Sequence, residues 1–301
     1  MTKKNLCYLI LAIIGISCSS NLYKKTEKAY DEQLKTLENQ ITSKEAKPLP
    51  PISPVMIESA YAQQLGIVKD TLSKTGSTVL LNSINTEWIS TVNFNLRKPN
   101  FIIIHHTAQD SIQRTIQTFT NTKTQVSAHY VVSKSGKVVQ MLNDYLRAWH
   151  AGISSWGKNT DINSCSIGIE LDNNGFKPFT EAQINSLIAL LTRLKKDYNI
   201  PTQNIIGHAD ITPGRKHDPS AFFPWKTLAE KGFGIWPDQI LEEAPFDFKI
   251  EPALRIIGYN TKNLSAAIMA FKLHYIQTDT TSTLDRKTID TIYSIYKKQF
   301  Q

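Results

Sequence analysis

The stretch "NFIIIHHTAQD" at residues 100–110 constrains the fold more than any other part of the chain. Its three successive isoleucines, residues 102–104, would place apolar side chains on both faces of a β-strand, which suits a strand that is covered on both sides. The runs "CSIGIELD" (165–172) and "NIIGHAD" (204–210) have the same character. Strands of this kind occur in sheets that carry helices on their faces, so the sequence predicts an α/β fold.

The segments between these strands complete the prediction. The stretch "HYVVSKSGKVVQML" (129–142) holds two β-rich runs around a Ser-Gly pair and predicts a hairpin. Apolar residues at helical spacing predict helices over 111–119 and 180–199; in the second, Thr180 is the expected N-cap and Gln183 completes a capping box. We therefore expect an α/β domain with a central mixed β-sheet flanked by helices.

The first twenty residues, "MTKKNLCYLILAIIGISCSS", have the zones of a secretory signal. The apolar run at 6–16 follows two lysines and is shorter than the roughly 20 residues that span a bilayer. Cys18 lies just beyond it, which resembles a bacterial lipoprotein signal. We predict a lipoprotein signal peptide over residues 1–17 with lipidation at Cys18; a plain signal peptide with an incidental cysteine is the alternative.

The composition and the apolar pattern of the remaining segments predict how the chain is divided into domains and linkers. The segment "KPLPPISPV" has four prolines in nine residues and predicts a stiff spacer. Near the C-terminus the sequence predicts a small domain of three helices, the second and third with apolar stripes at helical spacing, which we interpret as a binding rather than a catalytic unit. We predict a tether and Pro-rich linker over 18–55 and a catalytic domain over 56–240, with its clear core at 100–240. A helical C-terminal domain follows over 245–301. Its three helices are predicted at 251–258, 263–277 and 284–298.

The charge of the chain indicates the kind of partner. There are 34 lysines and arginines against 26 aspartates and glutamates, which gives a net charge of +8. Such an excess suits an anionic partner, for example a cell-wall polymer, a membrane surface or a nucleic acid. The sequence contains no recognisable nucleic-acid-binding module, so we expect no nucleic-acid partner.

Three residues predicted at one edge of the sheet have the chemistry of metal ligands. A catalytic zinc site takes three protein ligands and leaves the fourth position to water. His105 and His208 end predicted strands, and Asp218 lies on the proline-braced loop that follows. His106 competes with His105, because the two side chains point to opposite faces and the residues alone do not choose between them.

Further candidates surround these three. Glu170 lies inside a predicted buried strand, where it is either a general base or one partner of a buried salt bridge. Lys216 is either an oxyanion-stabilising group or an ordinary surface lysine. Asp210 could orient one of the metal ligands, whereas the side chain of His217 could simply be solvated. The candidates for substrate binding are His129, Trp149 and His150. For the two histidines a structural role is equally open.

Five motifs, which follow one another along the chain in the order typical of the family, resemble those of the zinc-dependent N-acetylmuramoyl-L-alanine amidases. This family includes phage-lysozyme-type amidases and animal peptidoglycan recognition proteins. The start of the chain and its C-terminal helices resemble the periplasmic lipoprotein type with a peptidoglycan-binding-like domain. The motifs are "IIIHHTA" (102–108), "SAHYVVSKSGKVVQML" (127–142), "RAWHAGISSWG" (147–157), "NSCSIGIELDNNG" (163–175) and "GHADITPGRKHDPSAFFPW" (207–225).

The resemblance implies a ligand set and a reaction. It favours His105 over His106 as the first ligand of one zinc ion per chain, with His208 and Asp218 as the others. It implies Glu170 as the catalytic acid–base and Lys216 as the oxyanion partner. The implied reaction is hydrolysis of the amide between N-acetylmuramate and L-alanine in peptidoglycan or muropeptides.

The resemblance also implies where the protein lies. We expect a monomer in the periplasm that is anchored by a lipid at Cys18, with the outer membrane as the expected membrane. Three other interpretations remain at this point. One is a non-catalytic peptidoglycan-binding protein on the same fold, and another is a zinc hydrolase that cuts within the peptide stem. The third is a surface scaffold whose function lies in residues 245–301.

Overall fold

The computed structural model describes residues 28, 31, 32, 35, 36, 39, 98–109 and 111–300. The chain divides into two compact units, Met1–Leu96 and Arg97–Gln301. The described residues of the first unit are helical and exposed. The predicted signal peptide, Cys18, the Pro-rich linker and residues 56–97 lie outside the described residues, and their predictions stay predictions.

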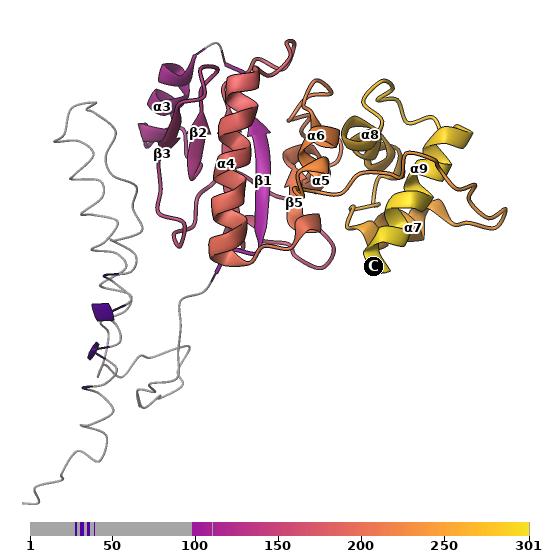
Figure 1. Cartoon of the computed structure of the whole chain (residues 1–301), viewed down its shortest axis with the longest axis horizontal. Helices are drawn as coiled ribbons and strands as arrows, with labels where there is room; N and C mark the ends of the chain where they lie inside the picture. Colours follow the sequence, from indigo (N-terminus) through magenta and orange to yellow (C-terminus); the bar gives the residue numbers. More distant parts are fainter. Residues whose placement is uncertain are drawn as a thin grey trace, which may run out of the picture. The chain divides into compact units, whose positions relative to one another are not determined.

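The second unit is built on a five-stranded sheet, which confirms the predicted mixed sheet (Figure 1). The strand order is β3-β2-β4-β1-β5, in which only the β2–β3 hairpin pair is antiparallel. Strand β1 lies between β4 and β5 and pairs with both in parallel, so the carboxyl ends of all three meet at one edge. The bounds are β1 (Phe101–His106), β2 (Tyr130–Val132), β3 (Val138–Gln140), β4 (Ser166–Leu171) and β5 (Ile205–Gly207).

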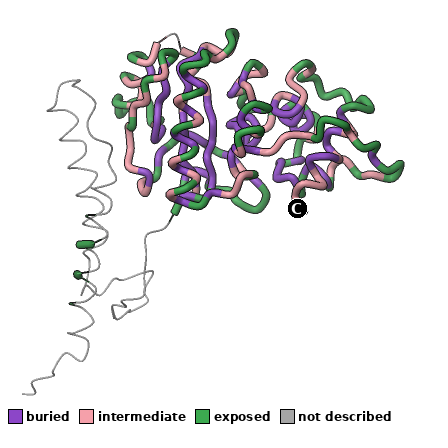
Figure 2. Tube along the Cα trace, viewed as in Figure 1, coloured by how far each residue is buried: buried purple, intermediate pink, exposed green. Residues whose placement is uncertain are grey.

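The isoleucine run of β1 is buried because each face of the sheet has its own core (Figure 2). Ile102 and Ile104 point into a core that includes Leu187 and Leu191 of helix α4 (Glu181–Tyr198). Phe101 and Ile103 point into a second core on the other face. The predicted strand covered on both sides is therefore confirmed.

Helix α4 begins as the sequence predicts, but its capping box is only half formed. Thr180 Oγ1 accepts a hydrogen bond from the Gln183 backbone N–H at 3.2 Å. The Gln183 side chain does not reach back to the cap; its amide donates to the carbonyls of Val132 and Asp172 at 2.9 and 3.3 Å. Because this side chain is fully buried, the two carbonyls at the ends of β2 and β4 supply the acceptors that its amide N–H groups need.

The shorter elements connect the strands. Helix α3 (Ile112–Thr120) starts at Ser111, whose side chain accepts a bond from the Arg114 N–H. Helix α5 (His208–Ile211) directly follows β5. The others are helix α6 (Trp225–Glu230) and the 3₁₀ turns η1 (Ile162–Ser164), η2 (Thr202–Asn204) and η3 (Lys298–Phe300).

The three predicted C-terminal helices are present as α7 (Ile250–Ile257), α8 (Leu264–Tyr275) and α9 (Arg286–Lys297). They share the second core with the sheet, since Leu254 and Phe271 belong to the same buried cluster as Ile103 and Ile206. Arg97–Gln301 form one compact unit in which these helices pack against the sheet, and the predicted domain boundaries stay predictions. No helix within the described part of the chain has the length and apolarity needed to cross a membrane.

Candidate active site

Three side chains converge at the carboxyl edge of the sheet. His105 lies near the end of β1, and His208 opens α5 immediately after the neighbouring strand β5. Asp218 comes from the loop beyond α5. The Nδ1 atoms of His105 and His208 are 3.0 Å apart, and Asp218 Oδ2 lies 3.2 Å from the first and 3.0 Å from the second.

These atoms fit a divalent metal ion. Zinc bonds of about 2.0 Å at tetrahedral angles separate the ligand atoms by about 3.3 Å, close to the three distances found. The Nε2 atom of His208 lies 3.3 Å from the carbonyl oxygen of Ala151, which can only accept a hydrogen bond. That contact places the His208 proton on Nε2 and leaves the Nδ1 lone pair facing the other two atoms.

A longer hydrogen-bond chain sets the tautomer of His105. The Ser166 hydroxyl donates to the carbonyl of Ile162 at 2.6 Å, so its oxygen accepts from His150 Nε2 at 3.1 Å. Neutral His150 then accepts, through Nδ1, the Nε2–H of His105 at 3.0 Å. The His105 Nδ1 lone pair is therefore aimed at the candidate metal position.

Burial keeps the imidazoles of His105 and His150 neutral. Burial, together with the neighbouring His208, lowers the pKa of His105 to about 4. Burial likewise holds the pKa of His150 well below its usual range. Burial on its own would raise the pKa of Asp218, but its hydrogen bonds with His105 and His208 lower it instead. Neutral imidazoles and an ionised carboxylate are the forms that bind metal ions.

His106, the competing histidine, points elsewhere. Its Nδ1 accepts a hydrogen bond from the backbone N–H of Ser220 at 3.1 Å. Its ring packs so closely against Gly175 that a Cβ there would lie 2.9 Å from the ring. The cluster of potential metal ligands within the described residues consists of His105, His208 and Asp218.

Glu170 lies beside this cluster without a partner of its own. It stands in register with His105 on the adjacent parallel strand, so both side chains leave the same face of the sheet. Its Oε2 atom is buried and has no hydrogen-bond partner, and among the described residues it forms no ion pair. Burial, reinforced by Asp218 and opposed by Lys216, raises its pKa to about 8. The buried salt bridge that the sequence left open is not formed.

The ligand cluster opens into a cleft of about 760 Å³. Lys216 and His217 line it, and both side chains are exposed. Its rim carries exposed aromatic side chains, and two residues of the C-terminal region complete one wall. The aromatic residues are Trp149, Phe176 and Phe222, and the C-terminal residues are Leu273 and Thr280.

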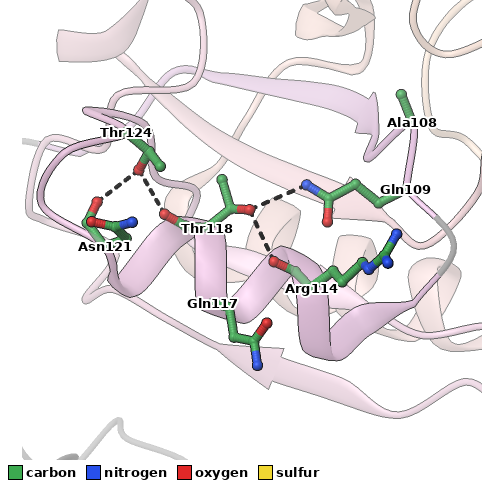
Figure 3. Close-up of a pocket in the computed structure, with 7 residues that line it drawn as sticks. All are labelled: Ala108, Gln109, Arg114, Gln117, Thr118, Asn121 and Thr124. Carbon is green, nitrogen blue, oxygen red and sulfur yellow. Dashed lines mark hydrogen bonds between the residues drawn. The ribbon is translucent and has the colours of Figure 1, made fainter.

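A smaller polar pocket of about 440 Å³ adjoins the cleft and shares Ala108, Gln109 and Thr118 with it (Figure 3). The Gln109 amide donates to Thr118 Oγ1 at 3.3 Å, whereas its carbonyl oxygen is buried without a hydrogen-bond partner. The remaining lining residues are Arg114, Gln117, Asn121 and Thr124.

The three candidates for substrate binding differ in their exposure and in whether their ring nitrogens are already hydrogen-bonded. Trp149 is 52% exposed and lines the cleft. His150 also lines the cleft, but its ring nitrogens are both used in the chain that orients His105. His129 is fully buried: its Nε2 donates to the Leu146 carbonyl and its Nδ1 accepts from the Gly168 N–H, each at 3.0 Å. His129 is therefore placed as a structural residue, because neither nitrogen is available to a substrate.

Some contributing residues carried no signal in the sequence. Ser166 ends the hydrogen-bond chain of His105 from the first position of β4. Arg215 donates to the carbonyls of Ala151 and Ile153 at 2.9 and 2.8 Å and fixes the backbone that His208 contacts. Serine and arginine are common at such positions, and only the folded chain shows what they bond.

Sequence and structure comparisons place the chain among known proteins. The family described as N-acetylmuramoyl-L-alanine amidase matches residues 95–221. The N-acetylmuramoyl-L-alanine amidase AmiD of Escherichia coli K12 is 36% identical over 219 residues, which cover 62% of this chain and 78% of that protein. The 1,6-anhydro-N-acetylmuramyl-L-alanine amidase AmpD of Haemophilus influenzae is 42% identical over 102 residues, 34% of this chain and 55% of that protein.

Solved structures agree. A complex of AmiD from E. coli with a muropeptide substrate matches with a TM-score of 0.61 and 30% identity, covering 72% of this chain and 96% of that one. The crystal structure of AmpDH3 from Pseudomonas aeruginosa matches with a TM-score of 0.62 and 26% identity, covering 74% and 98%. The chain belongs to the N-acetylmuramoyl-L-alanine amidase family. It is an enzyme, a hydrolase of the amide bond between N-acetylmuramate and L-alanine.

Proposed function

We propose that the chain performs this hydrolysis with one zinc ion held by Nδ1 of His105, Nδ1 of His208 and Oδ2 of Asp218. The observation that carries the proposal is the convergence of these three atoms, each with its lone pair aimed inward, beside the unpartnered carboxyl of Glu170. When bound, the ion lowers the pKa of a water molecule to about 7 and polarises the scissile carbonyl.

The chain's own residues then carry the protons and the charge. In its carboxylate form, which a divalent cation bound beside it would favour, Glu170 accepts a proton from the water that attacks the amide carbonyl. As the C–N bond breaks, Glu170 returns that proton to the nitrogen of L-alanine. Lys216, whose charge is felt at both Glu170 and His105, stabilises the oxyanion formed in between. The products are a muramyl carboxylate and a peptide with a free amino terminus.

We propose muropeptides as substrates, including those that end in an anhydro sugar. The AmiD structure holds anhydro-N-acetylmuramic acid-L-Ala-D-gamma-Glu-L-Lys, and an AmpDH3 structure holds an anhydromuramic pentapeptide. The cleft of this chain has the size of a small-molecule site, and the exposed Trp149 ring on its rim suits stacking on a sugar. Residues 245–301 add to this binding surface through Leu273 and Thr280.

Product analysis tests the proposed reaction. The full chain, purified in detergent, is incubated with a defined muropeptide, and the products are identified by mass spectrometry. We expect a free peptide that begins with L-alanine and a muramyl sugar without a peptide. Cleavage within the peptide stem would establish a different hydrolase, and intact substrate in the presence of bound zinc would favour a non-catalytic binding protein.

We also propose that the enzyme is a monomeric lipoprotein of the periplasm, anchored to the outer membrane through Cys18 and without a nucleic-acid partner. The signal-like N-terminus supports the location, and the net charge of +8 suits the anionic polymer of the cell wall as partner.

Substitution of Cys18 tests the anchor. Cys18→Ser removes the thiol that accepts the lipid, so we expect labelled fatty acid to be lost from the protein and the enzyme to move from the membrane to the soluble fraction. Cys165→Ser is the matched control, because Cys165 lies in the folded unit and should leave labelling unchanged. Equal labelling of Cys18→Ser and the parent would refute lipidation at this residue.

A further inference from the structure

A buried carboxylate joins the candidate metal centre to the C-terminal helices. Asp210 lies two residues beyond His208 and is 1% exposed. Its Oδ1 accepts a hydrogen bond from the Tyr259 hydroxyl at 2.6 Å. Its Oδ2 accepts from the Gly207 N–H at 2.7 Å and lies 2.7 Å from His274 Nδ1. Tyr259 and His274 both belong to the C-terminal region, so two of the three contacts cross from one part of the unit to the other.

The two partners are themselves held firmly. The His274 ring is stacked between those of Trp225 and Tyr275, with centroids 3.8 and 4.0 Å away. The Tyr259 ring packs edge-on against Trp156 at 4.9 Å. Side chains locked by packing in this way present their donors in a fixed position.

The segment that carries His208 depends on such external support. Helix α5 has four residues, too few to be stable alone. Its backbone is tied to the ligand loop, because the Ala209 N–H donates to the Asp218 carbonyl at 2.8 Å. Thr212 Oγ1 donates to the His208 carbonyl at 2.6 Å. A displacement of Asp210 would therefore move both His208 and Asp218.

We infer that Asp210, Tyr259 and His274 form a brace through which the C-terminal helices position the metal ligands His208 and Asp218. The inference rests on the proposed metal site. It assigns the C-terminal region a role inside the catalytic unit in addition to any binding of cell wall. The three brace residues are positioning residues, since none of them contacts the ligand atoms.

Zinc affinity of the full chain, measured by competition with a chelator of known affinity, tests the brace. Tyr259→Phe removes one hydroxyl from the carboxylate, and His274→Leu removes the Nδ1 donor. We expect each variant to bind zinc about 10-fold more weakly, the lower end of the effect of residues that orient metal ligands. We expect His274→Asn, whose amide can donate from nearly the same position, to recover most of the affinity.

Ser294→Ala is the matched control. It removes a buried hydroxyl of α9 that donates to Asp238 at 2.8 Å and has no contact with the three brace residues. We expect this variant to lower Tm without changing zinc affinity. Unchanged affinity in both Tyr259→Phe and His274→Leu would overturn the brace. A parent chain that binds no zinc would instead refute the proposed metal site on which the brace depends.

Discussion

Replacement of Glu170 by glutamine should lower kcat for muropeptide hydrolysis by about 10³-fold, which is within the range contributed by a positioned acid–base group. Glutamine has nearly the same shape but can neither accept the proton from the attacking water nor return it to the amine. The measurement is kcat on a defined muropeptide at equal zinc content. Retained zinc is expected, because Glu170 is not among the three converging ligand atoms.

The control for this variant is Glu181→Gln. Glu181 is an exposed glutamate in the first turn of α4, so the same change of chemistry should leave kcat unaltered. If Glu170→Gln kept more than about a tenth of the parent activity while holding a full complement of zinc, another group would have to transfer the proton, and the assignment would be wrong.

The second large effect concerns the adjacent histidines of β1. His105→Ala should weaken zinc binding by more than about 100-fold, beyond the range seen for residues that only orient ligands, and hydrolysis should fall to background. The reason is that it removes one of the three atoms that lie within 3.2 Å of one another. Zinc content after dialysis and the rate of hydrolysis are the two measurements.

His106→Ala is a control of the same type at the next position. Its Nδ1 bonds the Ser220 backbone rather than the ligand cluster, so the variant should retain one zinc ion per chain. The reverse pattern, with zinc lost from His106→Ala and kept by His105→Ala, would show that the wrong histidine has been assigned.

The fold could be predicted from sequence where local pattern alone decides the outcome. The isoleucines at 102–104 can only be buried together if both faces of the strand are covered, and two cores do cover them. The C-terminal helices were predictable from their apolar stripes. A stripe does not reveal its partner, however, and the second core shows that these helices pack against the sheet itself.

For the site, the candidate ligands could be predicted from the sequence, but the residues that support them could not. Strand ends and loop chemistry indicated the three candidate ligands, because parallel strands bring their carboxyl ends to one edge. The roles of His129, His150 and Asp210 could not be predicted in the same way. Each depends on bonds to residues far away in the chain; His274 and Asp210, for example, are separated by 64 positions. A histidine that orients a metal ligand and one that bonds only the backbone look the same in the sequence.

Anomalous diffraction at the zinc edge, from crystals of the chain grown with zinc, tests the central claim most directly. The structure predicts one peak per chain, bounded by Nδ1 of His105, Nδ1 of His208 and Oδ2 of Asp218. A peak bound instead by His106 or His217, with no metal between those three atoms, would contradict the proposed centre and the mechanism built on it.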